Sequence, residues 1–363
     1  MIGKIEILCT LGPASMNKKV IERLSDLNVD LFRINMSHTE LDDISQLINK
    51  IRNYSVVPIC IDTEGAQIRT GKFIDGSIYL EENNKLKIVG ESILGDKNKF
   101  NLYPIDIIDN LVIGDLINID FRSVLVQVID KTVNYLVIRV LSGGIIESNK
   151  AVSLQKQINL PPFTQKDKKT ISIAMDLNVK HFALSFANSS IDVKKLISLV
   201  GKNKFIISKI ESIDGLKNLD EICLASDAIL IDRGDLSRQV PIEKLPLIQK
   251  QIIRIAKSFN TKVYVATNLM ESMIINPFPT RAEVNDVYNT LSDATDGLVL
   301  AAETAIGSYP IHCVTMVKRI TEQYNRIQKD EHISLKYSEE KSSLFLIEPH
   351  GGVLVNQLIN PDD

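Results

Sequence analysis

The segment Lys204–Leu236, KFIISKIESIDGLKNLDEICLASDAILIDRGDL, contains the pattern that decides the fold. It opens with an apolar, β-branched run at Lys204–Glu211 and reaches a second such run at Ala228–Asp235. Continuous apolar runs are typical of parallel strands that are buried on both faces, and parallel strands need a crossover such as the stretch between these two. The segment is therefore predicted to be a strand–helix–strand unit.

The same unit recurs along the chain. Stretches with helical periodicity, such as Ile191–Val200 and Leu245–Ser258, lie between successive apolar runs. Eight strand–helix units favour a (β/α)₈ TIM barrel of the α/β class, with an open doubly wound sheet as the structural alternative. The eight runs are Lys4–Leu11, Leu31–His38, Pro58–Thr63, His181–Phe186, Lys204–Glu211, Ala228–Asp235, Lys262–Thr267 and Gly297–Thr304.

The alternation is interrupted between the third run and the fourth. Residues 72–159 show no long helical pattern and are expected to form an inserted small β-barrel lid domain, leaving 1–71 and 160–326 for the main barrel. An insertion at the carboxyl end of a barrel strand lies over the active face, where it can act as a lid. The strand-like pieces of the insertion are Ile78–Leu80, Leu86–Val89, Leu116–Ile119, Val124–Val128 and Tyr135–Val140.

The periodicity weakens toward the end of the chain. Residues 327–343 are mostly charged and polar, which indicates a linker. Residues 344–363 form a C-terminal tail that starts with the apolar stretch LFLIEPHGGVLVNQLI. The tail either docks on the barrel or begins a further domain.

Composition and charge limit the classes of partner. The 363 residues are 44% hydrophobic, which allows one large and one smaller domain, and the net charge of -3 gives no reason to expect a nucleic acid or an anionic membrane. With neither a signal peptide nor a run of roughly 18 apolar residues, we expect a cytoplasmic protein that does not span a membrane. The four cysteines, Cys9, Cys60, Cys223 and Cys313, are expected to be buried, reduced thiols.

Polar residues close most of the predicted strands, and the carboxyl ends of barrel strands meet at one pole. Lys209 and Glu211 lie two residues apart and therefore share a strand face, and Asp235 closes the next run. Two carboxylates with substrate oxygens and water suit Mg²⁺ or Mn²⁺. An ammonium beside them can stabilise a transferring phosphoryl group, and Arg33 and Arg69 are further cations suited to phosphate. This set predicts phosphoryl-transfer chemistry.

Each of these residues also has a plain structural explanation. An aspartate such as Asp235 often caps a helix, and a lysine such as Lys209 often lies at the surface. The recurrence of polar residues at five or more strand ends nevertheless favours a shared site. In the run Leu31–His38, alternation predicts that Arg33, Asn35 and Ser37 point to one face.

Motifs in a fixed order over roughly residues 4–325 resemble those of the pyruvate kinase family. The resemblance covers the barrel and the lid domain of that family, whereas the family's C-terminal regulatory domain is not found in the sequence. The matching motifs are Thr10–Ser15, Arg33–His38, Ile68–Gly71, Ile207–Glu211, Arg233–Leu236, Ala266–Thr267, Met270–Met273, Pro279–Glu283 and Glu303–Ala305, followed by Gly307 and Tyr309–Pro310.

The resemblance implies a glycolytic kinase that transfers a phosphoryl group between phosphoenolpyruvate and ADP, giving pyruvate and ATP. It implies that Lys209 and Arg33 are catalytic and contact the phosphoryl group, and that Glu211 and Asp235 bind Mg²⁺ or Mn²⁺. Phosphoenolpyruvate would further contact Gly234, Asp235 and Thr267. By the same resemblance the nucleotide lies near Asn35, His38 and Arg69, and K⁺ is coordinated by Asn35, Ser37, Asp62 and Thr63.

Several positions depart from the family pattern. The family's Asp-Thr-Lys-Gly-Pro-Glu is DTEGAQ at residues 62–67, so Glu64 reverses a charge and Gln67 replaces an acid linked with K⁺ dependence, which leaves the use of K⁺ open. The nucleotide-binding lysine is Ile306. In the lid, Phe121 replaces an acid, while Ala301-Ala302 replaces the Ser-Gly associated with proton transfer and Ala187-Asn188 stands where an arginine is usual.

These departures leave three functions open. The chain is a pyruvate kinase, an enzyme that uses phosphoenolpyruvate or pyruvate with another acceptor, or a non-catalytic module that binds metabolites. The tail sequence LIEPHGGVLV at 346–355 resembles the opening of ATP sulfurylase, which implies a fused domain or partner in sulfate activation. The oligomeric state, a homo-oligomer included, is also left open.

Overall fold

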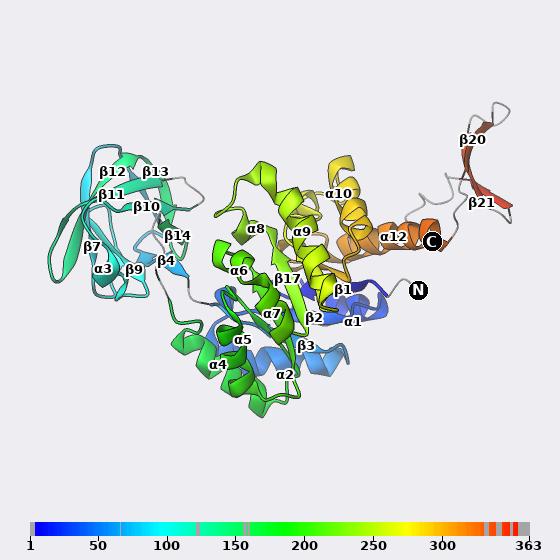
Figure 1. Ribbon diagram of the computed structural model, residues 1–363, viewed down its shortest axis with the longest axis horizontal. Coiled ribbons are helices and arrows are strands. Elements are labelled where there is room, and N and C mark those ends of the chain that lie inside the picture. The colour runs from blue at the N-terminus through cyan, green and yellow to red at the C-terminus, as the bar shows by residue number, and fades with distance from the viewer. Residues whose placement is uncertain are drawn as a thin grey trace. The chain divides into compact units, whose positions relative to one another are not determined.

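The structure is a computed structural model that describes residues 4–65, 67–120, 124–154, 158 and 160–329, with the backbone of 334–338, 343–348 and 351–354. Eight parallel strands close into a barrel in the order β1-β19-β18-β17-β16-β15-β3-β2, which confirms the predicted TIM barrel over the open sheet (Figure 1). The strands are β1 (Glu6–Thr10), β2 (Leu31–Asn35), β3 (Ile59–Asp62), β15 (His181–Leu184), β16 (Phe205–Ile210), β17 (Ala228–Asp232), β18 (Lys262–Ala266) and β19 (Gly297–Leu300).

Apolar composition explains why these segments are strands of a buried sheet. All five residues of β17 are buried, as expected for a parallel strand that is covered on both faces. The register between β16 and β17 pairs Lys209 with Leu230 and Ile210 with Ile231. The two strands therefore end at the same level, which brings the residues that follow them together.

Three of the predicted strands end earlier than expected. Their last polar residues form a helical turn instead of extended chain, because such residues can cap a turn: the Asn35 side chain accepts a hydrogen bond from the Ser37 N–H at 3.0 Å. The prediction that Ser37 lies on the strand face of Arg33 is therefore wrong. The turns are η1 (Met36–His38) after β2, α8 (Arg233–Leu236) after β17 and α11 (Ala302–Ala305) after β19.

Helices follow most of the strands, and the two predicted helical stretches are confirmed as α5 (Ser190–Val200) and α9 (Leu245–Ser258). Within the described residues, no helix is long and apolar enough to cross a membrane. The remaining helices are α1 (Lys18–Asp26), η2 (Leu41–Asp43), α2 (Ile44–Tyr54), α4 (Gln165–Asp176), α6 (Ile213–Lys217), α7 (Leu219–Ala225), η3 (Ile242–Lys244), η4 (Glu271–Ile274), α10 (Arg281–Ser292) and α12 (Pro310–Lys329).

The inserted segment forms a second closed barrel, as predicted, with the strand order β10-β11-β12-β7-β9-β4-β14 (Figure 1). Alternating apolar side chains fill it, among them the fully buried Phe100, Val126 and Ile138. Its strand β4 lies before residue 72, while the domain bounds themselves stay a prediction. The strands are β4 (Ile68–Thr70), β7 (Lys85–Val89), β9 (Lys99–Tyr103), β10 (Leu116–Ile119), β11 (Val124–Lys131), β12 (Tyr135–Ser142) and β14 (Ala151–Leu154).

Short additional elements complete the insertion. Strand β5 pairs with β8 and strand β6 pairs with β13, each in a two-stranded sheet, and one helical turn, α3, precedes β10. Their bounds are β5 (Lys72–Phe73), β6 (Ser77–Leu80), β8 (Leu94–Gly95), α3 (Ile107–Asn110) and β13 (Gly144–Glu147).

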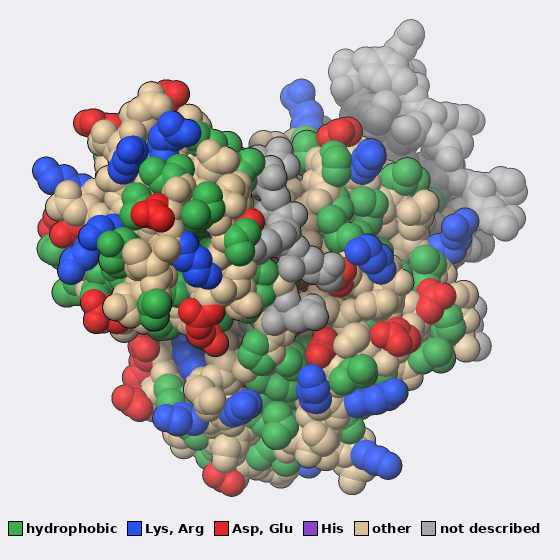
Figure 2. Space-filling view, turned by 60° about the vertical axis from the view of Figure 1, so that its left-hand side comes forward, with side chains coloured by type: hydrophobic (Ala, Val, Ile, Leu, Met, Phe, Trp, Pro, Cys, Tyr) green, Lys and Arg blue, Asp and Glu red, His purple; other side chains and the backbone are tan. Residues whose placement is uncertain are grey.

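By its internal contacts the chain consists of two compact units. The first comprises residues 1–34, 48–59 and 253–363 and carries β1, β2, β18 and β19. The second comprises residues 35–47 and 60–252 and carries β3, β15–β17 and the small barrel. On the face shown in Figure 2, basic and acidic side chains are interspersed over the surface.

In the tail, the backbone forms an antiparallel sheet of β20 (Ser334–Ser338), β21 (Ser343–Glu348) and β22 (Gly351–Leu354). Strand β20 and the end of α12 fall within the predicted linker, and Pro349 and His350 of the sulfurylase-like motif lie outside the described residues. The prediction for the cysteines is confirmed, because all four are free and buried.

Candidate active site

Lys209 lies at the centre of a buried acidic cluster in the second unit. Its side chain projects from β16 and is only 5% exposed. The Nζ atom lies 2.8 Å from Oε1 of Glu211, 3.3 Å from Oδ2 of Asp62 and 3.5 Å from Oδ2 of Asp232. It also donates a hydrogen bond of 3.2 Å to Oγ of Ser185. Surrounding acids favour the charged form of a buried ammonium, so the structure presents a preorganised cation.

Glu211 follows directly after β16 and is 0% exposed. Its Oε2 accepts a hydrogen bond of 2.6 Å from the N–H of Phe186, a residue held in the left-handed region with φ 51°. Its Oε1 is buried and forms an ion pair with the Lys209 Nζ at 2.8 Å, and in the part of the chain that the structure describes it accepts no hydrogen bond. Burial raises the pKa of Glu211 well above its usual value, Lys209 lowers it, and Asp235 and Asp232 raise it further.

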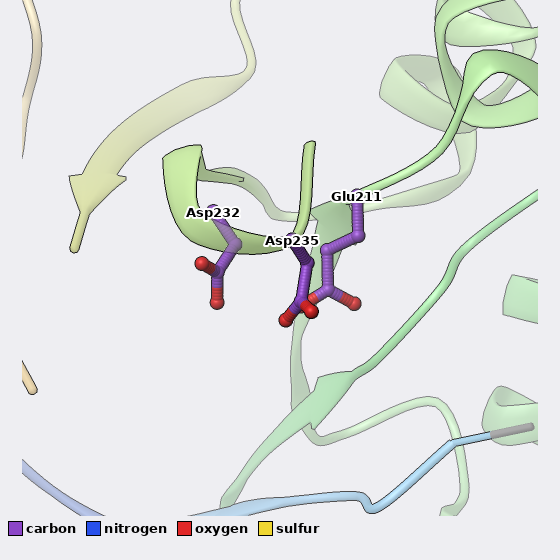
Figure 3. A group of neighbouring side chains, drawn as sticks. All are labelled: Glu211, Asp232 and Asp235. Carbon is purple, nitrogen blue, oxygen red and sulfur yellow. The ribbon is translucent and has the colours of Figure 1, made fainter. Parts of the chain in front are cut away.

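Three carboxylates converge beside Lys209. One oxygen from each of Glu211, Asp232 and Asp235 lies within 4.8 Å of the other two, and Figure 3 shows their carboxyl groups turned toward the same side. Asp232 is the last residue of β17, and Asp235 lies in the turn α8. Oxygen donors are the ligands of Mg²⁺ and Mn²⁺, and Glu211 Oε1 offers a lone pair that no hydrogen bond uses. The residues therefore fit a divalent cation.

Asp235 also forms an ion pair with Arg238. Nη1 of Arg238 lies 2.8 Å from its Oδ1. Burial is the main cause that raises the pKa of Asp235, Asp232 raises it further, and Arg238 lowers it in part. A cation bound by Asp235 would therefore share this carboxylate with the guanidinium.

Ser185 and Asp232 also belong to this cluster; on sequence alone, Ser185 has no place in the site and Asp232 is only one of the polar residues that close a strand. Ser185 Oγ donates hydrogen bonds to Oδ1 of Asp62 at 3.2 Å and to the Thr63 carbonyl at 2.6 Å. The Ser185 N–H donates to Thr63 Oγ1 at 3.0 Å. The signal available in the sequence was position alone, because Ser185 follows β15 directly and Asp232 closes β17.

Arg69 and Ser37 meet near the start of the small barrel. Nη2 of Arg69, on β4, donates to Ser37 Oγ at 3.5 Å, and Nη1 donates to the Asn149 carbonyl at 2.9 Å. Burial lowers the pKa of Arg69, while the negative charge of Asp235 raises it. His38, at the end of η1, is exposed.

The charge-reversed residue Glu64 has partners of its own. Nζ of Lys166 lies 3.9 Å from its Oε1 and also donates to the Met36 carbonyl at 2.6 Å. The buried Asp167 accepts hydrogen bonds from the N–H groups of Glu64 at 2.7 Å and Gly65 at 3.1 Å. Burial raises the pKa of Glu64, and Lys166 counteracts this effect. The segment after β3 is thereby tied to the start of α4.

Gly234 lies in the turn α8 of the second unit, whereas Arg33 and Thr267 lie in the first unit. Arg33, on β2, is 5% exposed, and its Nε donates to Oγ1 of Thr10 at 2.9 Å. Thr267 follows β18 with a φ of 75°, a strained conformation for a β-branched residue and one that clusters at functional sites. Glu303 accepts the N–H groups of Met270 and Ala301, so this acid orders the backbone after β18 and β19. Ile306 is 61% exposed, whereas Phe121 and Arg122 lie outside the described residues.

Comparison with known proteins places this geometry in a family. Residues 2–314 match the family model of the pyruvate kinase barrel domain. The chain is 35% identical to pyruvate kinase of Thermotoga maritima over 327 residues, which are 88% of this chain and 70% of the relative. It is also 35% identical to the Geobacillus stearothermophilus enzyme over 332 residues, 88% of this chain and 57% of the relative. Plastidial pyruvate kinase 3 of Arabidopsis thaliana is 30% identical over 371 residues, 99% of this chain and 64% of the relative. The chain therefore belongs to the pyruvate kinase family.

Proposed function

We propose that this protein transfers the phosphoryl group between phosphoenolpyruvate and ADP, giving pyruvate and ATP. The observation that carries the proposal is the buried Lys209 ammonium with three carboxylates within 3.5 Å of its Nζ. Phosphoryl transfer depends mostly on positioned cations that stabilise charge on the transferring group, and a preorganised ammonium in a buried site is suited to that task. The relatives at 35% identity are named pyruvate kinase, which supports the same reaction.

Each residue has a defined role in this proposal. The Lys209 ammonium stabilises negative charge on the phosphoryl group and on the enolate oxygen, and Arg33 binds the phosphoryl oxygens. Glu211 and Asp235 hold Mg²⁺ or Mn²⁺, which supplies positive charge to the phosphoryl oxygens when bound. Thr267 and Gly234 bind the carboxylate end of phosphoenolpyruvate.

The nucleotide and K⁺ roles rest on the resemblance to the family. The nucleotide lies near Asn35, His38 and Arg69, of which Arg69 offers a guanidinium for phosphate oxygens. K⁺ is held by oxygens of Asn35, Ser37, Asp62 and Thr63. In the structure, Asn35 Oδ1 is engaged by the Ser37 N–H, and Asp62 by Ser185 and Lys209.

A coupled assay tests the proposal. Pyruvate formed from phosphoenolpyruvate is reduced by added lactate dehydrogenase, and the oxidation of NADH is followed with ADP and Mg²⁺, with and without K⁺. We expect turnover that requires both ADP and the divalent cation. Binding of phosphoenolpyruvate without pyruvate release at any ADP concentration would contradict the proposal and favour a metabolite-binding module.

The second candidate is the same chemistry with another acceptor. It is favoured by Ile306, which is 61% exposed and stands where the family pattern has a nucleotide-binding lysine. A screen of nucleoside diphosphates and other phosphoryl acceptors, read by pyruvate release, separates the two candidates, because the acceptor with the highest kcat/KM identifies the reaction.

The proposed link to sulfate activation has no support in these comparisons. The match to the Arabidopsis thaliana plastidial enzyme covers 99% of the chain and so extends into the tail, where the sulfurylase-like motif lies. The cytoplasmic location stays a prediction, and the oligomeric state stays open.

A further inference from the structure

We propose that Asp232 is a third ligand of the divalent cation, together with Glu211 and Asp235, so that the cation binds tightly before phosphoenolpyruvate arrives. The inference rests on the proposed function, because it concerns the same cation site. The family resemblance implies only the other two acids as ligands.

The geometry brings Asp232 into the ligand set. It is the last residue of β17, and the register of β16 with β17 sets it beside Glu211, the residue after β16. The nearest oxygens of the three acids lie within 4.8 Å of one another. Octahedral Mg²⁺ with bonds of about 2.1 Å spans ligand oxygens about 3 to 4.2 Å apart, so the three carboxylates are near enough to reach one cation after small side-chain movements.

One further observation favours a cation at this place. The buried Glu211 Oε1 pairs with the Lys209 Nζ at 2.8 Å but accepts no hydrogen bond among the described residues, although carboxylate oxygens at such depth are usually hydrogen-bonded.

Asp232 also forms an ion pair with Lys209. The 3.5 Å between its Oδ2 and the Lys209 Nζ is an electrostatic contact longer than a good hydrogen bond. The other role open to Asp232 is to position and charge Lys209 without touching the cation. The two roles differ in their effect on cation binding when no substrate is present.

The consequence concerns the order of binding. A cation held by two carboxylates depends on substrate oxygens to complete its coordination and to neutralise its charge. A third carboxylate supplies both the additional ligand oxygen and the additional negative charge from the protein itself. Phosphoenolpyruvate should therefore strengthen cation binding much less in the parent protein than in a variant without the Asp232 charge.

The test is Mn²⁺ titration of the full chain by electron paramagnetic resonance, without substrates, on the parent protein and on Asp232→Asn, Glu211→Gln and Asp235→Asn. The matched control is Asp220→Asn, an exposed aspartate of α7. Losing one charge-assisted ligand should raise the Kd for Mn²⁺ about ten- to a hundredfold in Asp232→Asn and leave the control unchanged. Phosphoenolpyruvate should recover much of this loss, and Asp232→Glu, which keeps the carboxylate, should bind Mn²⁺ more tightly than Asp232→Asn.

The outcomes separate this inference from the proposed function. If Glu211→Gln and Asp235→Asn lose Mn²⁺ affinity but Asp232→Asn binds like the parent, the inference is overturned while the two-acid site stands. If neither Glu211→Gln nor Asp235→Asn changes the affinity, the cation site of the proposed function is itself wrong. Circular dichroism melts of each variant ensure that the comparison is made on folded protein. If Asp232→Asn misfolds, Asp232→Glu becomes the deciding variant. The inference is then overturned if Asp232→Glu binds Mn²⁺ no more tightly than Glu211→Gln does.

Discussion

Replacing Lys209 by methionine should affect both turnover and stability. The substitution keeps most of the side-chain stem, because methionine is unbranched and of similar length. It removes the positive charge beside Glu211, Asp62 and Asp232, whose carboxylate oxygens lie 2.8, 3.3 and 3.5 Å from the Lys209 Nζ. Any loss of turnover or stability therefore reflects the missing charge more than a change in packing.

The expected magnitudes follow from burial and charge. Loss of one preorganised charge in a buried site typically costs on the order of 10² to 10³ in rate. Removing one partner from a buried ion pair costs about 3 to 5 kcal/mol of stability, because the remaining acids are left uncompensated. Lys209 is 5% exposed and Glu211 is 0% exposed, so water offers little compensation.

The stability loss should depend on pH. Burial already raises the pKa of Glu211, and removing the ammonium raises it further. An acid whose pKa is raised in the folded protein lowers stability progressively as the pH rises above its unfolded pKa, and the cost is absent where both states are protonated. The destabilisation should therefore be larger at about pH 7.5 than at about pH 5.5, and Mg²⁺ should reverse part of it.

Urea unfolding at the two pH values and the coupled assay measure these effects. The matched control is Lys202→Met, which removes an exposed lysine shortly before the same strand. Two results would refute the reasoning. One is turnover of phosphoenolpyruvate above about a tenth of the parent rate, because that would leave the rate loss far short of the 10² to 10³ expected for a preorganised charge. The other is a free energy of unfolding equal to that of the control at both pH values, because then Lys209 is not the counter-ion of the buried acids.

Three further predictions can be checked on the same protein. Because burial raises the pKa values of Glu211 and Asp235, protons compete with the cation, and Mn²⁺ affinity measured by electron paramagnetic resonance should fall between about pH 7.5 and about pH 5.5. Ile306→Lys should tighten ADP binding about ten- to a hundredfold in calorimetry, and an unchanged Kd would remove Ile306 from the nucleotide site. Asp167→Asn, which weakens the backbone anchor of the segment after β3, should lower the free energy of unfolding by about 1 to 3 kcal/mol, with the exposed Asp176→Asn as a neutral control.

The strands could be predicted because their apolar runs are continuous, but their ends could not. A polar residue after an apolar run either continues the extended chain or caps a turn, and the local sequence does not distinguish the two. Arg233–Leu236 and Ala302–Ala305 form turns, so Asp235 and Glu303 lie beyond the strands that they were expected to close. Lys209 and Glu211 nevertheless meet, because the long lysine side chain reaches the residue after the strand.

The residues that were missed depend on register between strands. Alternation along one strand places Lys209 with Glu211, but nothing in the sequence states which residue of β17 lies beside them. The observed pairing of Ile210 with Ile231 is what sets Asp232 at the level of Glu211. Such pairings join residues that are far apart in the sequence. For a site composed of several strand ends, the sequence therefore predicts the chemistry but only some of the residues that take part.

Two departures from the family pattern, Glu64 and Ile306, differ in whether a neighbouring side chain offsets the change in charge. At Glu64 the reversed charge is paired with Lys166, 3.9 Å away, and the adjacent backbone is held by Asp167. Lys166 therefore offsets the negative charge that Glu64 introduces. Ile306, by contrast, is an exposed apolar side chain and contributes no charge to an anionic ligand. Of these two departures, only the one at Ile306 argues for weaker binding of nucleotide phosphate, and it is there that the choice of acceptor should be tested first.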